Sequence, residues 1–188
     1  MNREQLIDQL FKNAEETVNV FNNLPEILTD LGFNVPKCYD PSRRGGIMKA
    51  GFGMNDYEIK QIGKIINKPD PEFENKLNKY TAYAKGKYSV LVSLKVFLSE
   101  QGKFKPAFNG QPIGEFISIA GGVAFEWNNG YVFTAFSGRA SQADQAILIM
   151  AAYKTGIVDK KGIEVYYQIT SNPYLEANLF GALISEMK

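Results

Sequence analysis

The residues best placed to bind a ligand lie in residues 137–144, where a predicted strand ends in Ser137-Gly138 and a predicted helix begins three residues later. A glycine at such a turn lets a ligand approach the backbone closely, and the start of a helix offers N–H groups. Ser137, Gly138, Arg139, Ser141 and Asp144 are therefore the candidate ligand-binding residues. The alternative is structural: Gly138 makes a tight turn, and Asp144 complements the positive end of the helix dipole.

A second candidate is the glycine-rich stretch that begins at Ser42-Arg43-Arg44-Gly45-Gly46 and continues through Lys49, Gly51 and Gly53. Arg43, Arg44 and Lys49 are candidate anion-binding residues, because glycines leave backbone N–H groups accessible and these side chains supply positive charge. The spacing is neither a Walker A loop nor a dinucleotide-binding fingerprint. A phosphate- or nucleotide-handling loop and a flexible or partner-binding loop both stay open as interpretations.

Missing residue types exclude several kinds of chemistry. The chain has no histidine, so a Ser–His–Asp or Cys–His catalytic group is impossible. Its one cysteine, Cys38, cannot form a disulfide within the chain or a zinc site of the four-cysteine kind. We find no carboxylate pair in an apolar setting that would serve as an acid–base dyad. The sequence therefore favours a non-enzymatic protein, with no catalytic residue and no metal ligand assigned.

The charge pattern bears on partners and location. The formal net charge is only +1, and four of the 21 basic residues are arginine, which argues against a protein dedicated to duplex DNA. No apolar run approaches the roughly 18 residues of a membrane span, and the N-terminus does not read as a signal peptide. We therefore expect a cytoplasmic protein without a membrane partner.

Helices are predicted in the first half of the chain, because apolar residues recur there at steps of three and four. The first helix covers residues 6–21, and a short second one follows Pro25 and stops at Gly32. Residues 33–54 are rich in glycine and proline and predict a long irregular loop, either functional or only mobile. Asn55 is expected to cap another helix with Glu58, and Asp70-Pro71 to open the next.

The second half predicts strands as well as helices. Residues 88–98 alternate between apolar and other side chains, as do residues 163–170, and both read as strands. Residues 123–127 and 131–136 flank Asn128-Asn129-Gly130, which is typical of a β-hairpin. Ser141 is expected to cap a helix that ends at Gly156, and Asn172-Pro173 to open a last helix. The apolar side of that last helix is predicted to consist of Leu175, Leu179, Leu183 and Met187.

These elements predict an α+β fold with a single central, mostly antiparallel sheet and helices packed on it. With 188 residues and 45% hydrophobic content, the chain is expected to form a single domain, residues 1–188. Within it we expect a helical N-terminal region over residues 1–70, including the loop 33–54, and a sheet-containing core over residues 71–188.

One segment resembles a known family. Gly121-Gly122, an apolar strand, Gly130 in the hairpin, Ser137-Gly138 and then a helix with Asp144 and Ala146 are the matching features. Residues 121–156 thereby resemble the C-terminal half of the GlcG-like haem-binding family, which includes the C-terminal domain of PduO-type corrinoid adenosyltransferases. The resemblance implies a profilin-like arrangement, frequent oligomerisation and a small planar ligand such as haem. The N-terminal half of the family pattern is not visible, and without histidine the iron would need Tyr, Met or Cys38 as its ligand.

Three functional hypotheses follow. The first is a small-ligand-binding domain, for haem or another planar molecule, at residues 137–144. The second is a structural or protein-interaction protein, expected to be a homo-oligomer or to bind a protein partner. The third is a phosphate- or nucleotide-handling enzyme that uses the loop containing Arg43 and Gly53.

Overall fold

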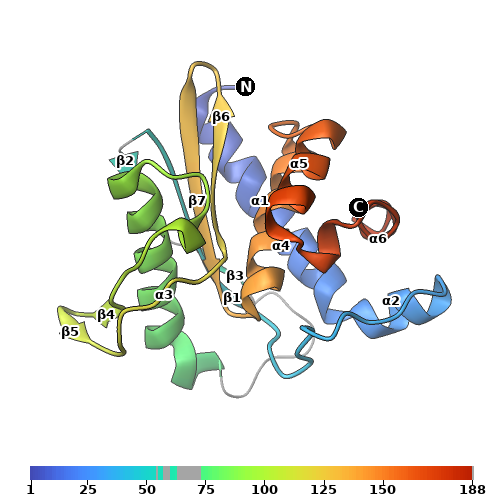
Figure 1. The fold of residues 1–188 in the computed structure, drawn as a ribbon, viewed down its shortest axis with the longest axis horizontal. Helices are drawn as coiled ribbons and strands as arrows, with labels where there is room; N and C mark the ends of the chain where they lie inside the picture. Colours follow the sequence, from blue (N-terminus) through green and yellow to red (C-terminus); the bar gives the residue numbers. More distant parts are fainter. Residues whose placement is uncertain (54, 57–59, 63–72, 188) are drawn as a thin grey trace.

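A central antiparallel sheet organises the chain (Figure 1). The computed structural model describes residues 1–53, 55–56, 60–62 and 73–187. Strands β1 (Gly46–Phe52), β7 (Gly130–Ser137) and β6 (Gly122–Trp127) lie side by side in that order, and all their pairings are antiparallel. The short strands β2 (Asn55–Asp56) and β3 (Lys60–Ile62) pair with β1 on its other side. A separate small sheet consists of β4 (Ala107–Phe108) and β5 (Gln111–Pro112).

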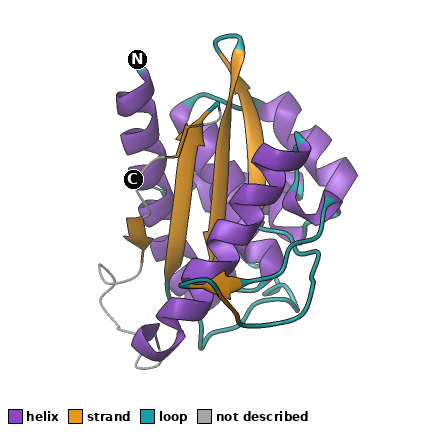
Figure 2. Cartoon of the chain, turned by 90° about the vertical axis from the view of Figure 1, so that its left-hand side faces the viewer, coloured by secondary structure: helices purple, strands orange, loops and turns teal. Residues whose placement is uncertain are grey.

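Helices cover both faces of this sheet (Figures 1 and 2). α3 (Phe73–Leu94) lies on one face, against β1 and β7. α1 (Arg3–Asn22) and α4 (Ser141–Thr155) pack against each other on the opposite face. The other helices are α2 (Leu24–Asp30), α5 (Lys160–Thr170), α6 (Ala177–Ser185) and two 3₁₀ turns, Ser99–Gln101 and Pro173–Leu175. The fold is therefore α+β, as the sequence predicted, and none of the described helices is both long and apolar enough to cross a bilayer.

The main core lies between the sheet and the layer of α1 and α4. Met48, Ala50 and Phe52 of β1 point into it, and so do Val132 and Phe136 of β7. Side chains from both the N-terminal and the C-terminal parts of the chain fill this core, because α1 packs on α4 rather than forming a region of its own. The alternate residues of the strands face α3, where smaller clusters form.

The prediction of an irregular stretch over residues 33–54 is wrong for its last third. Residues 46–52 form β1, which is buried along its whole length and pairs with β7 from Ile47 to Phe52. The glycines misled the prediction because here they permit close packing instead of a loop. A Cβ atom on Gly46 would lie 2.5 Å from Phe136 Cζ and 2.5 Å from the Ser137 carbonyl oxygen.

The prediction of a helix beginning at Asn55 is also wrong for the residues of this segment that the structure describes. Asn55–Asp56 and Lys60–Ile62 are strands that pair with β1. The proposed capping partner Glu58 and the expected helix start at Asp70-Pro71 lie outside the described residues.

Two predicted strands are helices. Residues 88–94 belong to α3, whose buried positions include Tyr80, Ala84, Tyr88 and Leu91, a helical spacing. Residues 163–170 belong to α5, whose N-cap Asp159 accepts a hydrogen bond from the Gly162 amide. In both segments the alternation arose because solvent-facing positions also carry apolar side chains, Leu94 in α3 and Val165 and Ile169 in α5.

The hairpin and the two N-terminal helices are confirmed. The last helix begins later than predicted, because Asn172-Pro173 opens the 3₁₀ turn Pro173–Leu175 and α6 begins at Ala177 with Glu176 as its N-cap. β6 and β7 pair from Gly122 opposite Ala135 to Trp127 opposite Gly130. Asn128 and Asn129 have φ values of 45° and 61°, so the two asparagines occupy the central turn positions and Gly130 begins β7. At the C-terminus, the four residues predicted to point inward are all buried: Leu175, Leu179, Leu183 and Met187.

Candidate functional site

The two segments singled out in the sequence meet in space. β1 pairs with β7 so that Ile47 lies opposite Ser137, which brings Gly45 against Gly138. A Cβ atom on Gly138 would lie only 1.9 Å from the Gly45 carbonyl oxygen and 2.3 Å from Gly46 Cα. The glycine at this strand-to-helix turn therefore admits a neighbouring backbone segment, so its function here is packing.

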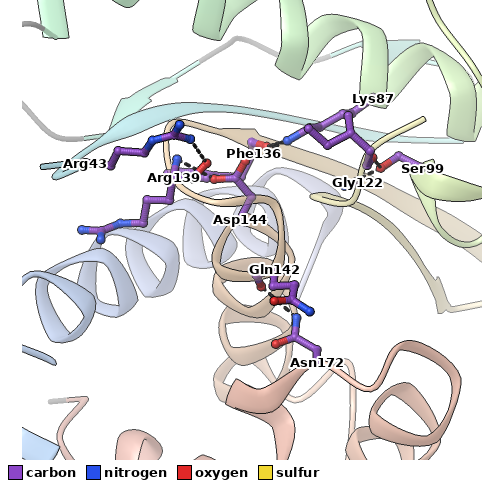
Figure 3. Close-up of polar contacts among 10 residues, drawn as sticks. Arg43, Lys87, Ser99, Gly122, Phe136, Arg139, Gln142, Asp144 and Asn172 are labelled. Atoms are coloured by element: carbon purple, nitrogen blue, oxygen red, sulfur yellow. Dashed lines mark hydrogen bonds and ion pairs between the residues drawn. The ribbon is translucent and has the colours of Figure 1, made fainter. Parts of the chain in front are cut away.

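Asp144 is held in a buried ion pair beneath this turn (Figure 3). Its Oδ2 lies 2.8 Å from Lys87 Nζ, and its Oδ1 accepts a hydrogen bond of 2.8 Å from the Arg139 amide. Lys87 Nζ also donates to the Phe136 carbonyl oxygen at 2.8 Å. Burial raises the pKa of Asp144, while Lys87 and the two hydrogen bonds oppose that shift. The carboxylate thus ties α4 to α3 and β7 and faces the protein interior.

Lys87 was missed by the sequence reasoning because it lay inside the wrongly predicted strand. Gly121, with φ of 109°, makes room for it: a Cβ atom there would lie 2.6 Å from Lys87 Nζ. A helical reading of residues 80–91 would have placed one lysine among Tyr80, Ala84 and Leu91 on the buried side, which is the signal for a paired internal charge.

The Arg139 side chain extends away from Asp144 towards α1 (Figure 3). It is only 4% exposed, and its Nη2 donates to Asn22 Oδ1 and, at 3.5 Å, to the Val18 carbonyl oxygen. Its guanidinium carbon lies 5.7 Å from the centroid of the Phe21 ring. Burial lowers the pKa of Arg139 to about 10, so the group is still positively charged at neutral pH.

Ser137 and Ser141, predicted to bind a ligand, are less accessible or less involved in the turn than the sequence indicated. Ser137 is buried at the end of β7. Ser141 is the first residue of α4, whose N-cap is Ala140 without a side-chain hydrogen bond, so the predicted Ser141 cap is wrong. The structure brings the five predicted ligand-binding residues together, yet it buries four of them in a turn that is filled by its own packing.

The predicted anion-binding residues separate into two groups. Arg43 Nη1 donates to the Arg139 carbonyl oxygen at 2.8 Å, and Arg43 Nε lies 3.0 Å from Asp40 Oδ2. Arg44 is half-buried next to them and within electrostatic reach of Arg139. Arg43, Arg44 and Arg139 are called the arginine corner below. Lys49, in contrast, is buried under α3 with its Nζ 4.8 Å from the centroid of the Tyr88 ring.

A pocket lies on the α3 face of the sheet, beyond the C-terminal end of α3. Its volume is about 410 Å³. The helix ends at Leu94, and Lys95, with φ of 53°, turns the chain away, so the neighbouring part of β6 and β7 is left uncovered by helix. This aromatic pocket is lined by Gly53, Val92, Lys95, Val96, Phe97, Ala124, Tyr131 and Phe133.

The walls of the aromatic pocket are rings that remain partly open to solvent. Phe97 and Tyr131 are 46% and 40% exposed, and their ring centroids lie 5.9 Å apart. The ring centroids of Tyr131 and Phe133 lie 6.1 Å apart, and the planes of the two rings differ by 31°. Sequence reasoning missed this site, because Val96 and Phe97 were assigned to a strand and nothing local shows where a helix stops relative to a sheet.

Comparison of the chain with protein-family models, with curated proteins and with solved structures returned no match. Within the described part of the chain, no group of three or more cysteine, aspartate or glutamate side chains is arranged to hold a metal ion.

Proposed function

We propose that the protein is a non-enzymatic binding module for a small, planar and mainly apolar ligand that occupies the aromatic pocket. The observation that carries this proposal is a hollow of about 410 Å³ walled by partly exposed aromatic rings. Ligand pockets of soluble proteins have volumes of roughly 300–1,000 Å³ and are lined mainly by apolar and aromatic side chains. Exposed aromatic side chains gathered around a concavity are typical of a surface that is covered when a ligand binds.

The lining also favours one kind of ligand. Among the described residues of the lining, Lys95 is the single charged side chain, so an acidic group on the ligand would find a cation at the rim. Phe97 and Tyr131 offer ring faces and edges for stacking. These features together favour an aromatic molecule with one carboxylate or sulfonate group.

Haem is a less suitable occupant on the same grounds. In the part of the lining that the structure describes, only the Tyr131 hydroxyl can supply an oxygen ligand to iron, and only Lys95 can pair with a propionate. A haemin titration tests this version directly. A Soret shift in the wild type that is lost in Tyr131→Phe would support haem, and an unchanged Soret band would remove it.

The general proposal is tested with anilinonaphthalene sulfonate, a planar aromatic monoanion whose fluorescence rises on binding. We expect saturable one-to-one binding to the native protein, loss of binding in Val96→Trp, which fills the pocket, and several-fold weaker binding in Lys95→Gln. Leu31→Trp is the matched control, because Leu31 is an exposed apolar residue at the end of α2. Far-UV and near-UV circular dichroism verify that each variant is native. Equal binding by the wild type and Val96→Trp would overturn the proposal.

A second candidate function is association with a protein, most simply a second copy of the chain. The observation that favours it is the outer side of α5, where Val165 and Ile169, one turn apart, are 50% and 62% exposed. A separate groove between α5 and α6 includes Tyr167 and Phe180. Light scattering decides this candidate: a dimer that Ile169→Asp dissociates would support it, and a monomer of 21.0 kDa at high concentration would count against it.

A further inference from the structure

We propose that the arginine corner is a second binding site, separate from the aromatic pocket, and that it takes a phosphate group. The arginine corner carries an excess of positive charge. Arg43 is paired with Asp40, but within the described residues no ion pair or hydrogen bond engages the guanidinium of Arg44. Arg44 lies close enough to Arg139 to disfavour the charge of Arg139. Three arginines thus lie together with only Asp40 and the already engaged Asp144 as nearby acids among the described residues, and this local excess of positive charge attracts an anion.

Asp144, the acid nearest in sequence to Arg139, cannot pair with the Arg139 guanidinium. Asp144 accepts the backbone N–H of Arg139, but its carboxylate is engaged by Lys87 in the buried ion pair. Within the described residues, the Arg139 guanidinium donates hydrogen bonds only to neutral acceptors, Asn22 Oδ1 and the more distant Val18 carbonyl oxygen. A buried guanidinium without a carboxylate is costly for a folded protein, and this cost is reduced when an anion binds.

The arginine corner also has a local excess of hydrogen-bond donors. Arg139 Nε, Asn22 Nδ2 and the Tyr174 hydroxyl are all buried, and none makes a hydrogen bond of normal geometry in the described residues; the Tyr174 hydroxyl has only the Cys38 thiol, a weak acceptor, beside it there. They gather around one ring: the Phe21 centroid is 5.7 Å from the Arg139 guanidinium carbon and 4.8 Å from the Tyr174 ring centroid. Buried polar groups normally have partners, so three unpartnered donors in one place indicate a missing acceptor.

The chemistry of these donors favours phosphate. A guanidinium presents planar N–H groups that match two oxygens of a phosphate, and the remaining oxygens can accept from a hydroxyl and an amide. Tyr174 stays protonated and can donate, because burial beside the Cys38 thiol raises its pKa. Tyr39, Arg43 and Arg44 near Arg139 are only half-buried, so the outer side of the arginine corner is in contact with solvent.

The test uses inorganic phosphate and phenyl phosphate as probes, measured by calorimetry and by thermal shift against sodium chloride of equal ionic strength. We expect saturable binding of phosphate, absent with chloride. Arg44→Gln should weaken it at least tenfold, and Arg3→Gln, which removes the same charge from the start of α1, should change it less than twofold. Tighter binding of phenyl phosphate would identify organic phosphates as the ligand class, and equal binding would identify the free ion. Equal responses to phosphate and chloride would overturn the proposal.

A second variant separates binding from folding. Tyr174→Phe removes an unpartnered buried hydroxyl, so the protein without phosphate should be as stable as the wild type or more stable, while its affinity for phosphate falls several-fold. Unchanged phosphate affinity in both Arg44→Gln and Tyr174→Phe would overturn the site. Val96→Trp, which blocks the aromatic pocket, should leave phosphate binding intact, so failure of one proposal is distinguishable from failure of the other.

Discussion

Replacement of Lys87 by methionine should lower the free energy of unfolding by about 3–5 kcal/mol at neutral pH, because it leaves one charge of a buried pair without its partner. Methionine keeps the length and apolar character of the lysine stem, so the change removes mainly the ammonium group. That group lies 2.8 Å from Asp144 Oδ2 and 2.8 Å from the Phe136 carbonyl oxygen, and both side chains of the pair are buried. The Asp144 carboxylate would then keep only the hydrogen bond from the Arg139 amide.

The pH dependence of this loss provides a sharper test than its size. Burial already raises the pKa of Asp144, and Lys87 is the strongest influence that lowers it, so the variant should have the higher folded-state pKa. A raised pKa means that the folded state retains a proton that the unfolded state releases. Stability conferred by that proton is present at low pH and is lost as the pH rises through the folded-state pKa. Lowering the pH from 7 should therefore narrow the gap between the variant and the wild type, by at most about 1.4 kcal/mol per pH unit.

Urea unfolding followed by circular dichroism at pH 7 and at pH 5.5 measures both quantities. Lys85→Met is the matched control, since Lys85 lies on the same helix and is exposed, and it should change the free energy of unfolding by less than about 0.5 kcal/mol. A Lys87→Met loss as small as that of Lys85→Met would refute the assignment of a buried ion pair. A gap of equal size at the two pH values would show that Asp144 is not the group left uncompensated.

Other substitutions test the packing of single residues. Gly138→Ala should prevent native folding or lower the melting temperature severely, because its Cβ would overlap the backbone of Gly45, and soluble expression and thermal denaturation measure this. Gly181→Ala, in α6 with open space around the added methyl group, should raise the free energy of unfolding by about 0.5–1 kcal/mol, and a loss in urea titration would contradict the assignment of helix there. Burial, with a smaller contribution from Glu126, raises the pKa of Tyr166 to about 12, so stability should fall as the pH rises from 10 towards 12, and the difference in tyrosinate absorbance between the wild type and Tyr166→Phe should appear near pH 12 instead of near the ordinary tyrosine pKa of about 10.

The elements that sequence predicts well are those whose signals are local. In α1 the apolar stripe and the burial coincide from Leu6 to Phe21, because an amphipathic helix at the surface of a core shows its period directly. The hairpin is equally clear, since two asparagines at positive φ between two apolar runs leave few other conformations.

The errors arise where tertiary structure overrides a local pattern. α5 presents Val165 and Ile169 to solvent, and β-branched residues at alternate positions read as a strand when their exposure is unknown. β1 reads as a loop because of its glycines, although the Phe136 ring and the β7 backbone lie too close to Gly46 for a side chain at that position. Neither the partner strand of β1 nor the exposure of the outer residues of α5 can be determined from a local window of sequence.

The contrast between local signals and tertiary structure also explains which parts of the candidate sites the sequence predicted. The sequence grouped Ser137, Arg139 and Asp144 correctly because they are close along the chain, but it could not show that Asp144 turns inward to Lys87, 57 residues away. It listed Arg43 and Arg44 without Arg139, because only the pairing of β1 with β7 brings them together. The aromatic pocket exists because α3 ends before the strands beneath it do. This depends on how the helix lies on the sheet, which neither segment of sequence shows by itself.

The two proposed sites lie at opposite ends of one strand, and this arrangement determines how they can act. Tyr131, near the start of β7, lines the aromatic pocket, and Ser137, at its end, leads into Arg139. Six residues of extended chain span about 20 Å, so one small ligand cannot reach both sites. Between the two sites, β7 is paired with β1 on one side and β6 on the other, and the Lys87–Asp144 pair fixes α3 and α4 near its end, so the strand connects the two sites rigidly. Substitutions in one site should therefore add to those in the other without coupling, and it is this independence that makes the separate tests of the two sites decisive.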